Sequence, residues 1–228
     1  MSKTTKAIVP FLFAGYPRNK TICYAKVKPA LSCYEHSRNK GVLKTLTWEG
    51  RRLTGITGNT YQYNNEGIRT KKITSNETTT FELEGSNIIS MNKTTSAENV
   101  RLDFVYDAGS SLIGVNTTEG HYFYIRDITG NILGLIDSTG KYIVKYKYDA
   151  WGKVLEKKIY ETCIASRHNP FVYKGYFLDE ETGFYYLKSR YYDTTIRRFI
   201  SIDSPEYINQ EDLSGLNLYA YCLNNPVI

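Results

Sequence analysis

The stretch Tyr146-Lys147-Tyr148-Asp149-Ala150-Trp151-Gly152 decides the fold class of this chain. Its alternating aromatic residues put Tyr146 and Tyr148 on one face of a β-strand. Asp149 followed three residues later by Gly152 is the signature of a type I turn, because the Asp carboxylate accepts backbone N–H groups and Gly adopts a positive φ without a steric clash. The stretch therefore predicts a strand that runs into a hairpin corner.

The same phrase recurs along the chain. It is written in residues 61–67, 122–130 and 137–140, and in a shortened form in residues 104–109, with aliphatic residues resuming after each corner. The predicted corner residues are Asn64 and Gly67, Asp107 and Gly109, Asp127 and Gly130, Asp137 and Gly140, and Asp149 and Gly152. This recurrence at hairpin spacing predicts an all-β protein made of antiparallel hairpins that form one curved sheet.

Tyrosine is abundant in the predicted sheet. The 228 residues include 21 Tyr and 9 Phe, and 41% of the chain is hydrophobic, enough to bury a core. Tyr suits a pleated and half-buried surface, so at hairpin spacing its abundance indicates broad sheet faces. A Tyr-rich sheet that binds carbohydrate or a cell surface is an alternative, which needs exposed and coplanar rings on one face.

Charge and cysteine usage exclude several function classes. The net charge is +6, and the excess of Lys and Arg lies within residues 1–72 without a nucleic-acid recognition motif, so no specific nucleic-acid partner is expected. The four Cys residues form no CxxC pair, which predicts neither a zinc site nor a redox pair, and no cofactor or metal is expected. The apolar run at residues 7–16 is interrupted by Pro10 and makes no convincing signal peptide or membrane span.

The two ends of the chain depart from the regular repeat. Residues 1–44 hold Pro10, Pro17 and Pro29 but no repeat phrase, which predicts a basic, irregular segment, either disordered or truncated. Residues 45–160 carry the regular hairpins. Residues 161–228 carry a denser and less regular version of the same grammar, most clearly in residues 169–193 and 216–227.

This C-terminal pattern resembles the Rhs or YD-repeat family. Residues 148–154 are similar to the YD repeat of Gram-positive members, and residues 161–228 are similar to the repeat-associated core. The core-motif positions are Gly175, Asp179, Gly183, Arg190, Tyr191, Tyr192, Asp193, Arg198, Phe199, Asn217, Tyr219, Tyr221, Asn225 and Pro226. Arg197 stands where the motif has a turn Gly, so a distorted turn is expected there.

The resemblance implies a structural function. Family members are large secreted or cell-wall-associated proteins, including polymorphic toxins of bacterial competition. Their YD repeats form one long β-sheet that spirals into a hollow shell, the core closes one end, and a C-terminal toxin is held inside. The partners implied are the rest of such a shell, or the C-terminal toxin with its immunity protein, and the localisation implied is secreted or wall-associated.

The resemblance also implies a catalytic residue. In many members the core is an aspartic autoprotease that releases the toxin, and Asp203 matches the first of its two aspartates. The second aspartate follows Asn-Asn-Pro-Val in the family, and the chain stops before it. Acid–base cleavage by a carboxylate pair requires two groups in different charge states, so Asp203 alone predicts no self-cleavage and is better interpreted as a turn residue before Pro205.

Size refines the predicted function. Roughly 13 strands about 4.8 Å apart would curl to a bore of about 20 Å, too narrow for a folded toxin of ~100 residues. We therefore expect a scaffold segment of an Rhs-type toxin-delivery shell, in a truncated or remnant form without the toxin domain. The alternatives are an autoprotease core that releases a toxin and the carbohydrate-binding sheet.

Overall fold

The computed structural model describes residues 31–36, 43–50, 52–201, 203 and 218–226. The chain forms two compact units that divide between Asn59 and Thr60. The first unit contains strands β1 (Leu31–His36), β2 (Leu43–Glu49) and β3 (Arg52–Ile56), which pair antiparallel in chain order. Strand β1 and the start of β2 depart from the irregular segment predicted for residues 1–44, because pairing between strands satisfies backbone groups without any corner phrase. Residues 1–30 and 37–42 lie outside the described part.

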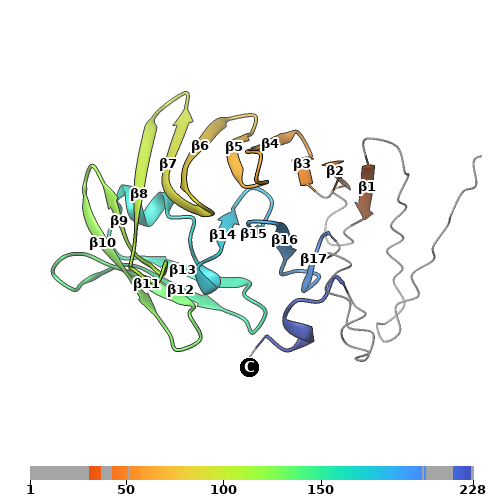
Figure 1. The fold of residues 1–228 in the computed structure, drawn as a ribbon. Helices are drawn as coiled ribbons and strands as arrows, with labels where there is room; N and C mark the ends of the chain where they lie inside the picture. Colours follow the sequence, from red (N-terminus) through yellow and green to blue (C-terminus); the bar gives the residue numbers. More distant parts are fainter. Residues whose placement is uncertain (1–30, 37–42, 51, 202, 204–217, 227–228) are drawn as a thin grey trace, which may run out of the picture. The chain divides into compact units, whose positions relative to one another are not determined.

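The second unit begins with a continuous series of antiparallel strands, which we call the wall sheet. Each strand pairs with the next one in the sequence, which confirms the predicted hairpin architecture. The strands are β4 (Asn59–Tyr63), β5 (Arg69–Ile73), β6 (Glu77–Glu84), β7 (Asn87–Thr95), β8 (Asn99–Tyr106), β9 (Leu112–Thr117), β10 (Gly120–Arg126), β11 (Ile132–Ile136), β12 (Tyr142–Tyr148) and β13 (Val154–Ile159). Figure 1 shows that strands β5–β13 follow an arc.

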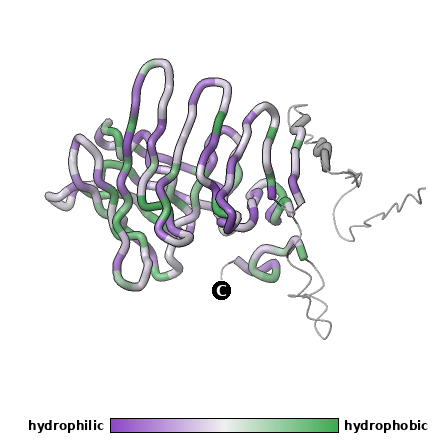
Figure 2. Tube along the Cα trace, turned by 45° about the horizontal axis from the view of Figure 1, so that its top comes forward, coloured by the Kyte–Doolittle hydropathy of each residue, from purple (hydrophilic) through white to green (hydrophobic). Residues whose placement is uncertain are grey.

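Alternation along the strands separates the two faces of the wall sheet. In β8 the side chains of Val100, Leu102 and Phe104 are buried while their neighbours in the strand are more exposed. In β10 the buried positions are Tyr122 and Tyr124. Figure 2 shows the resulting interleaving of hydrophobic and hydrophilic positions along the strands. One face of the wall sheet therefore supplies apolar side chains to the hydrophobic interior.

Three corners of the wall sheet share one hydrogen-bond pattern. At Asp127, Asp137 and Asp149 the carboxylate Oδ1 accepts the backbone N–H groups two and four residues later, at 2.8–3.0 Å. The Gly three residues after each Asp donates its N–H to the Asp carbonyl at 3.1 Å and has φ between 84° and 87°. Gly67 closes the Asn64 corner with the same backbone bond at 3.0 Å. The repeated sequence phrase therefore folds into the same corner geometry at each of these positions.

The Asp107 corner differs from the expectation. Ser110, and not Gly109, donates its N–H to the carbonyl of Asp107 at 2.9 Å and adopts the positive φ of 61°. This corner therefore has the same length as the others, and Gly109 occupies its third position. The sequence predicts Gly109 as the residue with positive φ, because Gly is the residue type most often found in that conformation.

The rest of the second unit forms the core. Helix α1 (Ile164–His168) and the 3-10 turn η1 (Tyr173–Gly175) lead into a second sheet of four antiparallel strands in chain order. These strands are β14 (Phe177–Asp179), β15 (Phe184–Leu187), β16 (Arg190–Asp193) and β17 (Arg198–Phe199), and a 3-10 turn η4 (Cys222–Asn224) follows. Figure 1 shows β14 on the inner side of the arc of the wall sheet.

The turn before β17 forms without the expected Gly. Arg197 itself adopts a φ of 60°, and Asp193 Oδ1 accepts the backbone N–H of Thr195 at 2.7 Å. The guanidinium carbon of Arg197 lies 5.3 Å from the ring centroid of Trp151, a distance at which a cation–π contact is favourable. This contact offsets part of the cost of a left-handed non-Gly residue.

Candidate functional site

Arg69 is the centre of a buried polar cluster between the wall sheet and the core. It begins β5, and its side chain is completely buried. Its Nη1 donates to Asp179 Oδ2 at 2.6 Å and its Nη2 donates to Asp179 Oδ1 at 3.0 Å, so the pair is bidentate. Asp179 ends β14 and is also completely buried. Two strands that are distant in the sequence are therefore joined by a charge-assisted contact that excludes water.

Aromatic rings surround the Arg69 guanidinium. Its central carbon lies 4.3–5.8 Å from five ring centroids, contributed by the wall sheet and by the core. The five rings belong to Tyr61, Phe81, Phe177, Tyr186 and Tyr191. The backbone N–H of Arg69 also donates to the hydroxyl of Tyr186 at 2.8 Å. Because a guanidinium is less strongly hydrated than an ammonium and stacks on rings, Arg suits this cage better than Lys.

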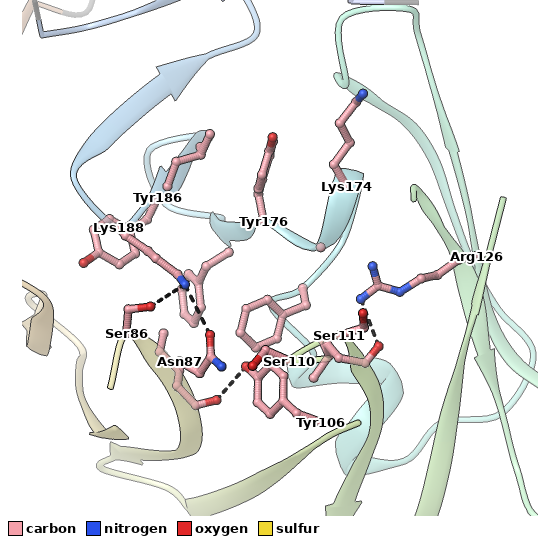
Figure 3. Close-up of a pocket in the computed structure, with 16 residues that line it drawn as sticks. Ser86, Asn87, Tyr106, Ser110, Ser111, Arg126, Lys174, Tyr176, Tyr186 and Lys188 are labelled. Atoms are coloured by element: carbon pink, nitrogen blue, oxygen red, sulfur yellow. Dashed lines mark hydrogen bonds between the residues drawn. The ribbon is translucent and has the colours of Figure 1, made fainter. Parts of the chain in front are cut away.

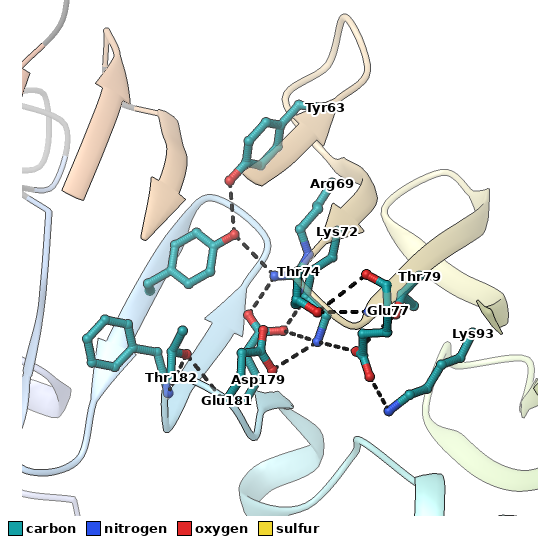
Figure 4. A network of polar contacts seen from close by, with 12 residues as sticks. Tyr63, Arg69, Lys72, Thr74, Glu77, Thr79, Lys93, Asp179, Glu181 and Thr182 are labelled. Atoms are coloured by element: carbon teal, nitrogen blue, oxygen red, sulfur yellow. Dashed lines mark hydrogen bonds and ion pairs between the residues drawn. The ribbon is translucent and has the colours of Figure 1, made fainter. Parts of the chain in front are cut away.

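Lys72 extends the cluster, which Figure 4 shows. Its Nζ lies 3.0 Å from Glu181 Oε2, 3.5 Å from Asp179 Oδ1 and 3.5 Å from Glu77 Oε1. Lys93 completes the set with an ion pair of 2.5 Å to Glu77. We call Arg69, Lys72, Lys93, Glu77, Asp179 and Glu181 the arginine cluster. Its three cations and three carboxylates balance, as burial of charge requires.

The pKa shifts in the arginine cluster follow from burial and pairing. Burial alone would lower the pKa of Arg69 and of Lys72, but the charge of Asp179 together with those of Tyr191 at Arg69 and Glu181 at Lys72 raises both pKa values above their usual ranges. Burial would raise the pKa of Glu77, yet hydrogen bonding from Lys93 and the charge of Lys72 lower it. Burial and the charge of Asp179 raise the pKa of Glu181. These shifts keep Arg69 and Lys72 charged and paired. The cluster is therefore better suited to fixing the core against the wall sheet than to transferring protons.

A second set of contacts attaches the core to the Asp149 corner. The hydroxyl of Tyr185 donates to the carbonyl of Gly152 at 2.8 Å, and that of Tyr192 donates to the carbonyl of Trp151 at 2.9 Å. The ring of Tyr173 packs against Gly152, where an added Cβ would lie only 2.4 Å from a ring atom. Gly152 is therefore required both by its φ of 85° and by this close approach.

Asp203 is placed beside a cation. Its Oδ2 lies 2.8 Å from Nη1 of Arg190, and the guanidinium carbon of Arg190 lies 3.6 Å from the ring centroid of Phe199. The backbone N–H of Asp203 donates to the carbonyl of Leu218 at 3.0 Å. This ion pair adds an anchoring contact to the predicted turn role; Pro205, which entered that prediction, lies outside the described residues. The described residues show no second carboxylate in an ion pair with Arg190.

The remaining core-motif residues support the same packing. Tyr221 stacks on Tyr192 with ring centroids 4.1 Å apart, and Phe199 donates its backbone N–H to the carbonyl of Tyr219 at 3.0 Å. Further positions are Gly175 and Gly183 with positive φ, buried Tyr191 and Asp193, Arg198 bridged to Ala220, Asn225 donating its N–H to the Cys222 carbonyl, and buried Pro226. Asn217 lies outside the described residues.

The sequence analysis did not identify Arg69 and Lys72. The segment Arg69-Thr70-Lys71-Lys72-Ile73 reads as a solvent-facing polar strand, and nothing local distinguishes its buried cations from exposed ones. Their partners Asp179 and Glu181 lie about 110 positions away, so only the folded chain brings these groups together. Within the described ranges, no group of three or more His, Cys, Asp or Glu side chains is placed to hold a metal ion, and no helix is long and apolar enough to cross a membrane.

Comparison with known proteins agrees with this architecture. The model of the family described as Teneurin YD-shell matches residues 94–227. The tRNA nuclease WapA of Bacillus subtilis (strain 168) is 33% identical over 192 residues, covering 81% of this chain and 8% of that protein. The double-stranded DNA deaminase toxin A of Burkholderia cenocepacia (strain H111) is 32% identical over 106 residues, covering 46% of this chain and 7% of that protein.

A solved structure shows the same fold. The crystal structure of TcdB2-TccC3-TEV superposes with a TM-score of 0.66 at 21% sequence identity, over 85% of this chain and 10% of that chain. The expected resemblance is therefore confirmed at the level of family and fold. Because the family model matches more than half of its residues, this chain belongs to the Teneurin YD-shell family and is a member of the Rhs/YD-repeat shell proteins.

Proposed function

We propose that this chain is a wall-and-core scaffold segment of an Rhs-type shell that holds a toxin polypeptide. The observation that carries the proposal is the arginine cluster, in which the buried side chains of Arg69 and Asp179 join the wall sheet to the core. A shell that retains a cargo needs a closing element that cannot detach from its wall. A buried bidentate ion pair meets that need, because separating it exposes an uncompensated charge to an apolar environment.

The relatives support a toxin as the partner. One is named as a tRNA nuclease and another as a DNA deaminase toxin, and the matched region is 8% and 7% of those proteins. The proposed partners are thus the rest of such a shell, or a toxin with its immunity protein, and the proposed site of action is outside the producing cell, secreted or at the cell wall.

The two alternative functions have less support. Among the tyrosines whose burial the structure describes, ten are buried, which does not favour a broad platform of exposed rings for carbohydrate. Asp203 is held by Arg190 in an ion pair, whereas an aspartic dyad uses two carboxylates that share a proton. Neither the buried tyrosines nor the paired Asp203 provides what those two functions require. The arginine cluster, in contrast, provides the attachment of core to wall sheet that closure of a shell requires.

A chimeric shell tests the proposal. The 192-residue region of the tRNA nuclease WapA that matches this chain is replaced by the chain, and protection of the nuclease against added protease is measured. Protection equal to that of the parent shell is expected, with loss of protection in the Asp179→Asn chimera. Lys147→Gln, which breaks an exposed ion pair of 2.6 Å with Glu156, serves as the matched control and should keep protection. Digestion of the nuclease in the unmutated chimera would overturn the proposal.

A further inference from the structure

A cavity of about 520 Å³ lies between corners of the wall sheet and the core (Figure 3). Ser86 and Asn87 after β6, and Ser110 and Ser111 before β9, form one side of it. The core closes the other side with residues of η1, β14 and β15 and with Lys188. This volume falls within the range of small-molecule binding pockets.

The cavity is lined by three cations and no acidic residue. Of the sixteen lining residues, Arg126, Lys174 and Lys188 carry positive charge, and none is Asp or Glu. Within the described ranges, no carboxylate lies at ion-pair distance from any of the three. The arginine cluster is the opposite case, since each of its cations contacts a carboxylate. The cavity thus has uncompensated positive charge in a partly desolvated place, which favours an anion.

Arg126 has unused hydrogen-bonding capacity at this cavity. Its Nη2 donates to the carbonyl of Leu112 at 2.9 Å, and its Nη1 lies 3.5 Å from the carbonyl of Gly130. Its Nε is buried and has no hydrogen-bond partner in the part of the chain that the structure describes. Gly175 leaves room for the guanidinium, because an added Cβ would lie 3.3 Å from Nη2. The guanidinium therefore keeps its positive charge at the cavity, where it favours a bound anion.

Lys188 enters from the opposite side in Figure 3. Its Nζ donates to Ser86 Oγ at 2.7 Å and to Asn87 Oδ1 at 3.2 Å, which fixes the ammonium at the edge of the cavity. An ammonium has three donors, so one remains for a ligand after these two bonds. Arg126 and Lys188 therefore come from different elements, β10 and the turn after β15, and both line the cavity.

The neutral lining residues indicate what the anionic group is attached to. Hydroxyl and amide side chains such as Ser86, Asn87 and Ser111 both donate and accept hydrogen bonds, and they match a hydroxylated molecule. Rings of Tyr106, Tyr176 and Tyr186 provide flat apolar contact. We propose that this cavity binds a small hydroxylated organic anion of the sugar-phosphate or sugar-acid class, which is attracted by the positive charges of Arg126 and Lys188. This site is independent of the scaffold function.

Calorimetric titration of the full chain tests the site. The probes are glucose 6-phosphate, glucuronate, neutral glucose, inorganic phosphate and a Glu-Glu dipeptide, all at low salt. Saturable binding is expected for at least one of the first two, and comparison between them distinguishes the phosphate from the carboxylate source. Arg126→Gln and Lys188→Gln should each weaken that binding roughly tenfold or more, because each removes a charge-assisted bond. Lys153→Gln, an exposed lysine at the Asp149 corner, should leave it unchanged.

Several results would overturn the proposal. Absence of binding for both sugar anions excludes the site. Equal binding of glucose excludes recognition of the anion, and equally tight binding of inorganic phosphate or of the dipeptide excludes recognition of a hydroxylated ligand. Circular dichroism confirms that each variant is folded. Because Lys188→Gln changes a partly exposed side chain, it remains a valid test if Arg126→Gln does not fold.

Discussion

Arg69 and Asp179 are 110 positions apart in the chain and meet as a bidentate ion pair with both side chains completely buried. One residue belongs to the second strand of the wall sheet and the other to the first strand of the core. The wall sheet is otherwise paired only between strands that are neighbours in the sequence. This contact therefore carries information that the hairpin pattern does not contain, namely where the core is attached.

Breaking the pair on one side should be severe. Asp179→Asn leaves the Arg69 guanidinium without its counter-charge, and we expect a loss of about 3–5 kcal/mol in the free energy of unfolding. Urea denaturation followed by tyrosine fluorescence measures it. The double variant Arg69→Met/Asp179→Leu should lose less than the two single variants combined, because no isolated charge remains. Additive losses would contradict the pairing.

The tyrosine hydroxyls at the Asp149 corner should have a smaller effect. Tyr185→Phe removes the donor to the buried carbonyl of Gly152 and keeps the ring, so we expect a loss of about 1–2 kcal/mol in the free energy of unfolding. Tyr160→Phe is the matched control, because Tyr160 is 52% exposed, and it should change stability by less than about 0.5 kcal/mol. Equal effects from the two variants would show that the hydroxyl bond to Gly152 does not matter.

Two substitutions at hairpin corners should have opposite effects on the stability of the protein. Ser110 has φ 61°, so Ser110→Gly should stabilise the protein by about 0.5–1 kcal/mol through relief of left-handed strain. Gly140 has φ 84° with open space around an added Cβ, so Gly140→Ala should cost about 1 kcal/mol from the backbone alone. Thermal unfolding measures both. A destabilised Ser110→Gly variant would contradict the assignment of Ser110 to the left-handed position.

Acidification should weaken the arginine cluster through Glu77. Its pKa lies below the usual 4.5 in the folded chain, so its stabilising contribution is complete above pH 4.5 and is lost as the pH falls through the folded pKa. Glu77→Gln should lower the free energy of unfolding at pH 7, and the difference from the parent chain should shrink as the pH falls below 4.5. Urea midpoints measured from pH 7 to pH 3 test this.

Incubation of the purified chain should release no discrete fragment that depends on Asp203. The reason is that Arg190 keeps the carboxylate of Asp203 paired, while aspartic cleavage uses two carboxylates that share a proton. Mass spectrometry over several pH values provides the measurement, with Asp203→Asn as the comparison. A fragment present in the parent chain and absent from the variant would establish self-cleavage instead.

The wall sheet could be predicted from the sequence because its determinants are local. An Asp with a Gly three positions later fixes a corner, and aromatic alternation fixes which face is buried, so Asp127, Asp137 and Asp149 were identified without knowledge of any distant contact. At the Asp107 corner the residue with positive φ is Ser110 and not the predicted Gly109, because Ser110 adopts a conformation that residue type alone does not indicate.

The arginine cluster could not be predicted, because its determinants are not local. Arg69 and Lys72 lie in a strand whose sequence is typical of a solvated surface, and their burial depends on where β14 and β15 pack. Strand β1 could not be predicted from the repeat either, because it pairs with β2 although its sequence has no corner phrase. Likewise, Arg197 replaces a turn Gly with the help of Trp151, which lies in a different hairpin.

The nearest-neighbour pairing of β4–β13 has a consequence for how such genes change. Each hairpin contributes two adjacent strands of one sheet. The gain or loss of one hairpin by recombination would therefore change the sheet by two strands and leave the pairing of the other strands unchanged. Hairpin β8–β9 supplies no member of the arginine cluster, but it packs against the core through Phe104 and Phe171, whose ring centroids lie 4.7 Å apart. The strands around Arg69 are more constrained, since a change in their number would separate Arg69 from Asp179.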